Sequence, residues 1–448
     1  MIHKYKFKEN YIVMDVNSGA VHVVEDVIYD VLDHYDGSDN NAIAAALDGK
    51  YTAQQIDEAL EDIRTLKREG MLFTDDSYIT KELLESKEPA IKAMCLHIAH
   101  DCNMKCRYCF GDTGAFEGER SLMSYETGVK AIDFLISHSG SRRNLEIDFF
   151  GGEPLMNFEV VKRLVDYGKK AEAQFGKCIR FTITTNGILL DDDKTDFINE
   201  YMDNVILSID GRPEVNDNMR KTCGGQGTYD KIIGNYKRFV EKRVGLYYVR
   251  GTFTRENLDF SNDILHLTSC GFGNVSVEPA VLPPSVPFAL RDEDLEQIKE
   301  QYDLLAEICI EKAKAMENFE FFHFNIDLDQ GPCVVKRLSG CGAGTEYIAV
   351  SPEGDLYPCH QFVGNKNFLL GNLYESHFIN KLYDLFNNAH IYNKAACREC
   401  WAKFYCSGGC HANAFNINGD ILKPYVLGCE MERKRVECAI GIKAELNK

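Results

Sequence analysis

The sequence predicts an α/β fold: a partial (β/α)6 TIM barrel with a small winged-helix-like domain before it and a cysteine-rich domain after it. Strand-like and helical runs alternate through the middle of the chain, as in parallel sheets with helical crossovers. The first 76 residues hold short strands followed by helices, and seven of the 17 cysteines fall from Cys341 to Cys429. These observations divide the 448 residues into domains over 1–85, 86–315 and 316–448.

Composition narrows the possible partners. The formal net charge of -19 and pI of about 5.1 argue against nucleic acid or an anionic membrane as the main partner. No apolar run approaches the length of a membrane span, and the start of the chain has no signal-peptide core, so we expect a cytoplasmic protein. Cysteines in such a protein point to metal or redox chemistry before disulfides.

The first domain is predicted from local patterns. "YIVMDV" and "AVHVV" are strands on either side of a turn at 17–19, and 26–35 has one apolar helical face. A further helix begins at Thr52, where Gln55 completes a capping box, and ends at Gly70. Residues 25–76 hold 14 Asp or Glu against 4 Lys or Arg, so DNA would be repelled despite the winged-helix-like shape.

The central domain is predicted from six strands. They are "MCLHIAH", "LEIDFF", "IRFTITT", "NVILSID", "YYVRGTFT" and "NVSVEP". The longest helices between and after them are expected at 124–139, 158–175 and 293–316. Six strands make a partial barrel rather than a closed eight, and the site should lie at their C-terminal ends.

Three cysteines follow the first of these strands. Cys102, Cys106 and Cys109 have the spacing C-x3-C-x2-C. Three thiolates on a four-iron cluster leave one iron free to bind a ligand, whereas four would close the site. A zinc site, or a four-cysteine iron–sulfur site with its last ligand elsewhere, is the alternative.

Polar and glycine motifs follow later strands. Gly151, Gly152 and Glu153 follow the second, and the glycines would let backbone approach a ligand. The remaining candidates are Thr185 after the third strand, Ser208 and Asp210 after the fourth, and Arg220 downstream. Glu278 ends the sixth strand and is predicted to be solvated or structural rather than catalytic.

Together, these motifs resemble the radical S-adenosylmethionine (SAM) superfamily. The resemblance implies that the open iron of a [4Fe–4S] cluster on Cys102, Cys106 and Cys109 chelates SAM. The reduced cluster would cleave SAM to a 5′-deoxyadenosyl radical, which removes hydrogen from a substrate. It also implies SAM contacts from the seven residues after the strands, with Tyr108 of the cysteine motif as an eighth cofactor-binding residue.

The C-terminal cysteines resemble the SPASM extension of radical SAM peptide-modifying enzymes. The resemblance implies two auxiliary [4Fe–4S] clusters and so three in all. Cys397, Cys400, Cys406 and Cys429 would hold the outer auxiliary cluster, and Cys341, Cys359 and Cys410 the inner one. The eighth position would be filled by Cys333 or left open for a substrate cysteine, and we favour the open site. A zinc ribbon is the alternative.

The first domain resembles the PqqD-like element that binds the leader of a precursor peptide by strand addition. From end to end, the chain resembles the thioether-forming maturases of SCIFF peptides, the cysteine-rich ribosomal peptides of clostridia. The resemblance implies a cysteine-rich precursor peptide as substrate and reduced flavodoxin or ferredoxin as electron donor. Anaerobic sulfatase-maturating enzymes share the other two parts but typically lack the leader-binding domain.

The predicted activity is formation of a thioether between a cysteine sulfur and the Cα of an acceptor residue in that peptide. The alternatives are a carbon–carbon cross-link, formylglycine formation, or a non-catalytic iron–sulfur electron-transfer protein.

Overall fold

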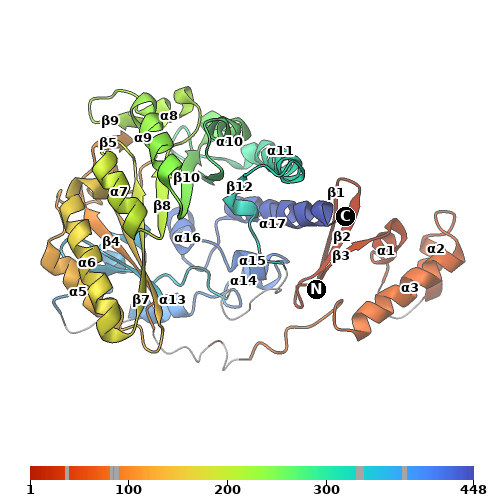
Figure 1. Cartoon of the computed structure of the whole chain (residues 1–448). Helices are drawn as coiled ribbons and strands as arrows, with labels where there is room; N and C mark the ends of the chain where they lie inside the picture. The colour runs from red at the N-terminus through yellow and green to blue at the C-terminus, as the bar shows by residue number, and fades with distance from the viewer. Residues whose placement is uncertain (36–39, 81–83, 85–89, 329–337, 376–380, 448) are drawn as a thin grey trace.

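The computed structural model describes residues 1–35, 40–80, 84, 90–328, 338–375 and 381–447. Cys333 and the predicted domain boundary at 85/86 lie outside these residues. Figure 1 shows an α/β core, with the N-terminal domain projecting from one side. Among the described residues, no helix is long and apolar enough to cross a bilayer.

The N-terminal domain is a three-stranded antiparallel sheet with helices on one side. The strands, in the order β1-β2-β3, are β1 (Ile2–Phe7), β2 (Asn10–Asp15) and β3 (Val21–Val24). The helices are α1 (Asp26–Val31), α2 (Asn40–Ala46) and α3 (Ala53–Arg68). The capping box of Thr52 and Gln55 is present, and Ile56, Leu60 and Ile63 of α3 are buried. Strand β1 was not predicted, because its residues are mostly half-exposed and three lysines lie at positions 4, 6 and 8.

The six predicted strands of the central domain are all present and parallel. They are β4 (Ala93–Ala99), β6 (Asn144–Gly151), β7 (Cys178–Thr185), β8 (Asn204–Ser208), β10 (Leu246–Phe253) and β11 (Asn274–Pro279). The helices of this domain are α5 (Tyr125–Ser137), α6 (Phe158–Phe175), α7 (Asp192–Tyr201), α8 (Pro213–Met219), α9 (Tyr229–Lys242), α10 (Phe260–Ser269) and α11 (Leu295–Lys314). The partial barrel is therefore confirmed.

The sheet continues beyond these six strands. Its order is β12-β11-β10-β8-β7-β6-β4-β13-β14-β15, so the C-terminal domain adds strands beside β4. The strands added on the β4 side are β13 (Tyr347–Val350), β14 (Asp355–Tyr357) and β15 (Gly371–Asn372), and β12 (Glu320–Phe321) is added beside β11 at the opposite edge. In the described chain, β12 and β15 form the two edges and the sheet does not close.

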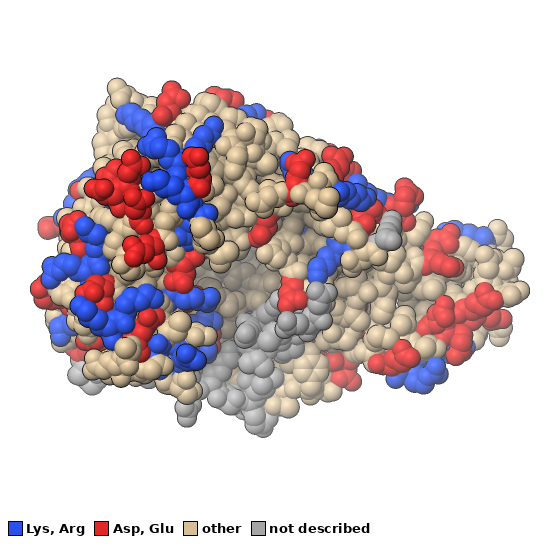
Figure 2. Space-filling model, viewed as in Figure 1, with Lys and Arg blue, Asp and Glu red and all other residues tan. Residues whose placement is uncertain are grey.

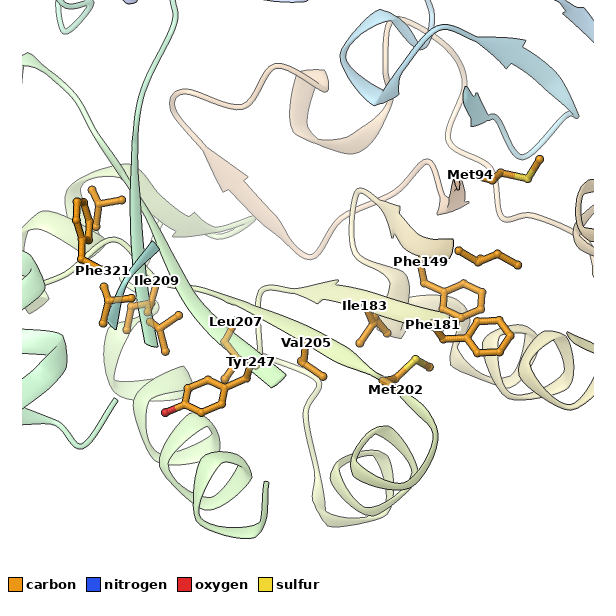
Figure 3. Close-up of a cluster of buried hydrophobic side chains, with 14 of the residues drawn as sticks. Met94, Phe149, Phe181, Ile183, Met202, Val205, Leu207, Ile209, Tyr247 and Phe321 are labelled. Carbon is orange, nitrogen blue, oxygen red and sulfur yellow. The ribbon is translucent and has the colours of Figure 1, made fainter. Parts of the chain in front are cut away.

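The core lies between this sheet and its helices. Alternate residues of β6, Leu145, Ile147 and Phe149, are fully buried on the helix side. Figure 3 shows Phe149 beside Phe181, with Ile183, Val205 and Leu207 continuing the layer across the neighbouring strands. The opposite face of the sheet, which carries Asp148, therefore faces the interior of the partial barrel.

The C-terminal domain adds short helices and one long one. They are α13 (Lys381–Asn387), α14 (Ala395–Arg398), α15 (Lys403–Cys406), α16 (His411–Asn418) and α17 (Val426–Leu446). Helix α17 lies between the barrel and the N-terminal sheet (Figure 1). On the barrel side Arg435 Nε donates to Tyr302 Oη at 2.9 Å, and on the other side Tyr5 Oη donates to the Glu437 carbonyl at 2.9 Å.

Candidate active site

Three cysteines lie together in the loop that follows β4. Strand β5 (Met104–Cys106) pairs with β9 (Arg220–Thr222), so Cys106 faces Arg220, and the Cys109 amide donates to the Cys106 carbonyl at 3.1 Å. Burial raises the pKa of Cys102 to about 12 and that of Cys106 to about 11. Cys109 raises both pKa values further, so the three sulfurs share one neighbourhood. Such thiols are stable as thiolates only beside a cation.

The donor set fits an iron–sulfur cluster better than a single ion. Among the described residues, no three His, Cys, Asp or Glu side chains converge tightly enough to hold one metal ion. A four-iron cluster fills the space between its ligand sulfurs, so these need not converge on a point. Three cysteines in one loop could ligate three irons of such a cluster and leave the fourth iron open.

Two glycines bring the end of β6 against the cysteine loop. Gly151 has φ +127°, and a Cβ there would lie 2.3 Å from the Ala99 carbonyl oxygen. A Cβ on Gly152 would lie 2.1 Å from the carbonyl oxygen of Asp101. Glycine is therefore required at both positions for close packing of backbone against backbone, and approach to a ligand at these glycines stays a prediction.

The side chains of Glu153 and Thr185 form a hydrogen bond with each other beneath this loop. The Glu153 side chain is 1% exposed; its Oε1 accepts from Thr185 Oγ1 at 2.7 Å and from the Leu155 amide at 3.1 Å. Its Oε2 accepts from the Asn186 amide at 2.7 Å. Burial raises the pKa of Glu153 to about 7, although these donors act in the opposite direction. In this structure Glu153 joins β6 to β7.

This carboxyl should make stability depend on pH. Its pKa is higher in the folded chain than in the unfolded one, so folding favours the protonated form. The protonated Glu153 carboxyl contributes about 3 kcal/mol to the free energy of unfolding below pH 4.5, and this contribution is lost as the pH rises towards 7. In SAM-free protein, Glu153→Gln should flatten the pH dependence of the urea midpoint in this range, whereas the exposed-site control Glu159→Gln should not. An unchanged slope in Glu153→Gln would contradict this assignment.

Tyr108, Asp210 and Arg220 form a second buried set. Asp210 is fully buried and accepts from Tyr108 Oη at 2.8 and 2.7 Å, from Arg220 Nε at 3.0 Å and from the Thr252 amide at 3.0 Å. The set joins the cysteine loop to the ends of β8 and β10. Ser208 lies beside it, half-buried, and its carbonyl accepts from Tyr236 Oη at 3.1 Å. The structure thus brings the predicted residues together and gives several of them protein partners.

Polar side chains on the inner face of the sheet were largely missed. Asp148 on β6 is opposite Cys95 of β4, and its buried Oδ1 has no hydrogen-bond partner among the described residues. Burial raises its pKa to about 6. Glu278 pairs with Arg250 at 3.4 Å and with His323 at 3.3 Å, which agrees with a structural role. The period-two pattern of "LEIDFF" could have revealed Asp148, since it sets Asp148 opposite the apolar face.

The C-terminal cysteines form two groups. The first, the inner group, comprises Cys341, Cys359 and Cys410. Burial is the main cause of the raised pKa of Cys359, and its neighbours Cys410 and Cys341 raise that pKa further. The second, the outer group, comprises Cys397, Cys400, Cys406 and Cys429. Burial raises the pKa of Cys406 most and Glu432 raises it next, and the other three cysteines of the group raise it further. Arg433 Nη1 lies 3.8 Å from the Cys400 sulfur. Both groups are sulfur-only donor sets, which suit iron–sulfur clusters, although four thiolates such as those of the outer group can also bind zinc.

Comparisons with known proteins find similarity to iron–sulfur protein families, in agreement with the three groups of cysteines. Residues 96–260 match the radical SAM superfamily and residues 341–401 match the SPASM iron–sulfur cluster-binding domain. The radical SAM cyclopropyl synthase TigE of Paramaledivibacter caminithermalis is 25% identical, over 71% of this chain and 68% of its own. The cysteine-type anaerobic sulfatase-maturating enzyme of Clostridium novyi is 23% identical, over 70% and 86%.

One solved structure is similar over nearly the whole length. The crystal structure of Streptococcus suis SuiB bound to precursor peptide SuiA covers 93% of this chain and 96% of its own, with a TM-score of 0.54 and 16% identity. That likeness establishes a shared fold. The two domain matches show that the chain contains a region similar to the radical SAM superfamily and a region similar to the SPASM iron–sulfur cluster-binding domain, and the relatives that it matches include maturases.

Proposed function

We propose that this enzyme forms a thioether between a cysteine sulfur and the Cα of an acceptor residue in a ribosomally made, cysteine-rich precursor peptide. One observation carries the proposal: a small domain with a free sheet edge is joined, in one chain, to the cysteine loop and to the two C-terminal cysteine groups. That combination suits an enzyme that holds a peptide at one place and modifies it at another.

The two edge strands of this sheet are β1 and β3, and β3 is the edge that we propose for the leader. Strand β3 pairs with β2 on one side, and no described strand pairs with its other side. Val23 on this strand is 54% exposed, so a leader strand could add here and pack towards α3. SuiB, which shares this fold, binds the precursor peptide SuiA. The domain therefore offers main-chain hydrogen bonds to a leader.

The acidic surface of this domain favours a leader with net positive charge. Figure 2 shows acidic side chains gathered on the projecting domain, and Asp57, Glu58, Glu61 and Asp62 of α3 are exposed. We expect leader affinity to fall by about tenfold from low to high salt, because salt screens exposed charges. Fluorescence anisotropy of a labelled leader tests this. A Glu58→Gln/Glu61→Gln variant should show a weaker salt dependence, and salt-independent binding would contradict the charge argument.

The remaining groups suggest a division of roles. SAM bound at the cluster of Cys102, Cys106 and Cys109 supplies the radical chemistry that removes hydrogen from the acceptor. The Tyr108–Asp210–Arg220 set and the Glu153–Thr185 pair hold the loops around that position. Figure 2 shows a hollow in the middle of this face of the molecule, and we propose it as the place where the peptide enters. Cys341, Cys359 and Cys410 would hold a cluster beside which the substrate thiol is deprotonated.

Product mass tests the proposal. Anaerobically reconstituted enzyme should be incubated with SAM, dithionite and a cysteine-rich precursor. Thioether formation removes two hydrogens and leaves one cysteine resistant to alkylation. A carbon–carbon cross-link also removes two hydrogens but leaves every cysteine reactive. Formylglycine formed from cysteine loses sulfur, and formylglycine formed from serine loses two hydrogens without linking two residues. The absence of 5′-deoxyadenosine would favour a non-catalytic role.

A further inference from the structure

One lysine is fully buried between the two C-terminal cysteine groups. Lys394 has no exposed surface, which is rare for lysine, and its Nζ donates to the Gly408 carbonyl at 2.8 Å. Gly408 lies midway between Cys406 of the outer group and Cys410 of the inner group. The backbone of the same lysine contacts the outer group, because the Lys394 carbonyl accepts from the Cys397 amide at 2.9 Å. One side-chain and one backbone hydrogen bond therefore place Lys394 beside cysteines of both groups.

The chain folds around the ammonium group. Ser407, Gly408 and Gly409 all have positive φ, at 61°, 89° and 72°. A Cβ on Gly408 would lie 3.3 Å from the lysine Nζ, so the loop and the side chain are in close contact. Three successive left-handed residues are an unusual arrangement, and here they direct a carbonyl oxygen at Nζ.

No carboxylate balances this charge. Among the described residues, no Asp or Glu forms an ion pair with Lys394, whereas Lys403 in the same domain pairs with Asp76 at 3.2 Å. A buried, unpaired ammonium is costly, and a single carbonyl does not offset that cost. The negative charge available is that of the cysteines. Burial lowers the pKa of Lys394, and the thiolates of Cys397, Cys406, Cys410 and Cys429 act against that shift.

We propose that Lys394 is an electrostatic positioning residue for both auxiliary clusters, and that its buried charge raises their reduction potentials. The inference rests on the proposed assignment of the seven cysteines to two clusters. Reduction adds one electron to a cluster, and no bond forms or breaks. A fixed positive charge in a dry site stabilises the added negative charge, so its loss should make reduction harder.

The test is a redox titration monitored by electron paramagnetic resonance, with dithionite as reductant. Full-length protein with Cys102, Cys106 and Cys109 changed to alanine would isolate the auxiliary signals. Lys394→Met should lower the equilibrium constant for reduction of each auxiliary cluster about tenfold, which is a shift of 59 mV to lower potential for a one-electron couple. Lys394→Arg should stay near the parent value, as should Lys423→Met, which removes an exposed lysine of the same domain.

Each outcome separates the possibilities. Unchanged potentials in Lys394→Met with full iron content would overturn the role of Lys394. If Lys394→Met and Lys394→Gln lose auxiliary iron while Lys394→Arg keeps it, charge compensation is supported. Loss in all three variants indicates packing instead and overturns the proposal. Parent protein with iron for fewer than two four-iron clusters would show instead that the cluster assignment is wrong.

Discussion

Replacing any one of Cys102, Cys106 and Cys109 with alanine should abolish SAM cleavage. The three sulfurs act as a unit, and removing one member of such a unit costs at least about 10³-fold in rate. The measurements are 5′-deoxyadenosine formation with dithionite and iron content, which should fall by one cluster. The auxiliary clusters should remain, because their cysteines belong to separate groups.

Cys223 provides the matched control. Its sulfur lies 3.6 Å from the Cys102 carbonyl oxygen, but it is exposed and outside the C-x3-C-x2-C pattern. Cys223→Ala should retain SAM cleavage. Loss of activity and of one cluster in Cys223→Ala would mean that the site has four cysteine ligands and no open iron, which contradicts the account.

Asp210→Asn should lower both the stability of the fold and the affinity for SAM, the second largest effect that we expect. Asp210 is the only described ion-pair partner of Arg220, whose side chain is 10% exposed. Removing the carboxylate charge leaves a buried guanidinium unpaired, which costs about 3–5 kcal/mol. Urea denaturation should therefore show a lower midpoint, and SAM binding should weaken because the cysteine loop loses its anchor at Tyr108.

Two controls distinguish this effect from ordinary ion-pair loss. Asp196→Asn breaks an exposed pair with Lys242 and should cost less than about 1 kcal/mol. Tyr108→Phe removes one neutral donor and should cost about 1–2 kcal/mol. If Asp210→Asn matched the parent protein in midpoint and SAM affinity, the buried set would not hold the loop.

The strands and helices of the central domain could be predicted because their periodicities are local. "FEVVKRLVDYGKKAEAQF" corresponds to α6, and each of the six predicted strand runs corresponds to a strand. The wider sheet was not predictable from sequence. Strands β13, β14 and β15 are two to four residues long, and their place beside β4 depends on pairing with a strand some 250 residues earlier.

In the candidate site too, contacts between residues far apart in the sequence could not be predicted. Cysteine spacing predicted candidate ligand residues, because those motifs are short and chemically specific, and the structure brings these cysteines together in groups. The partners of Glu153 and Asp210 could not be found this way, since Thr185 lies 32 residues from one and Tyr108 lies 102 residues from the other. Lys394 could not be singled out either, because only the folded chain shows it buried between two thiolate groups.

The proposed reaction requires the radical to take hydrogen from the Cα of a peptide residue. A precursor labelled with deuterium at Cα, one residue type at a time, tests this directly. We expect deuterium in 5′-deoxyadenosine with one labelled residue type, together with a product that tandem mass spectrometry shows linked from that residue to a cysteine sulfur. Unlabelled 5′-deoxyadenosine from every Cα-labelled peptide, despite a modified product, would contradict the account.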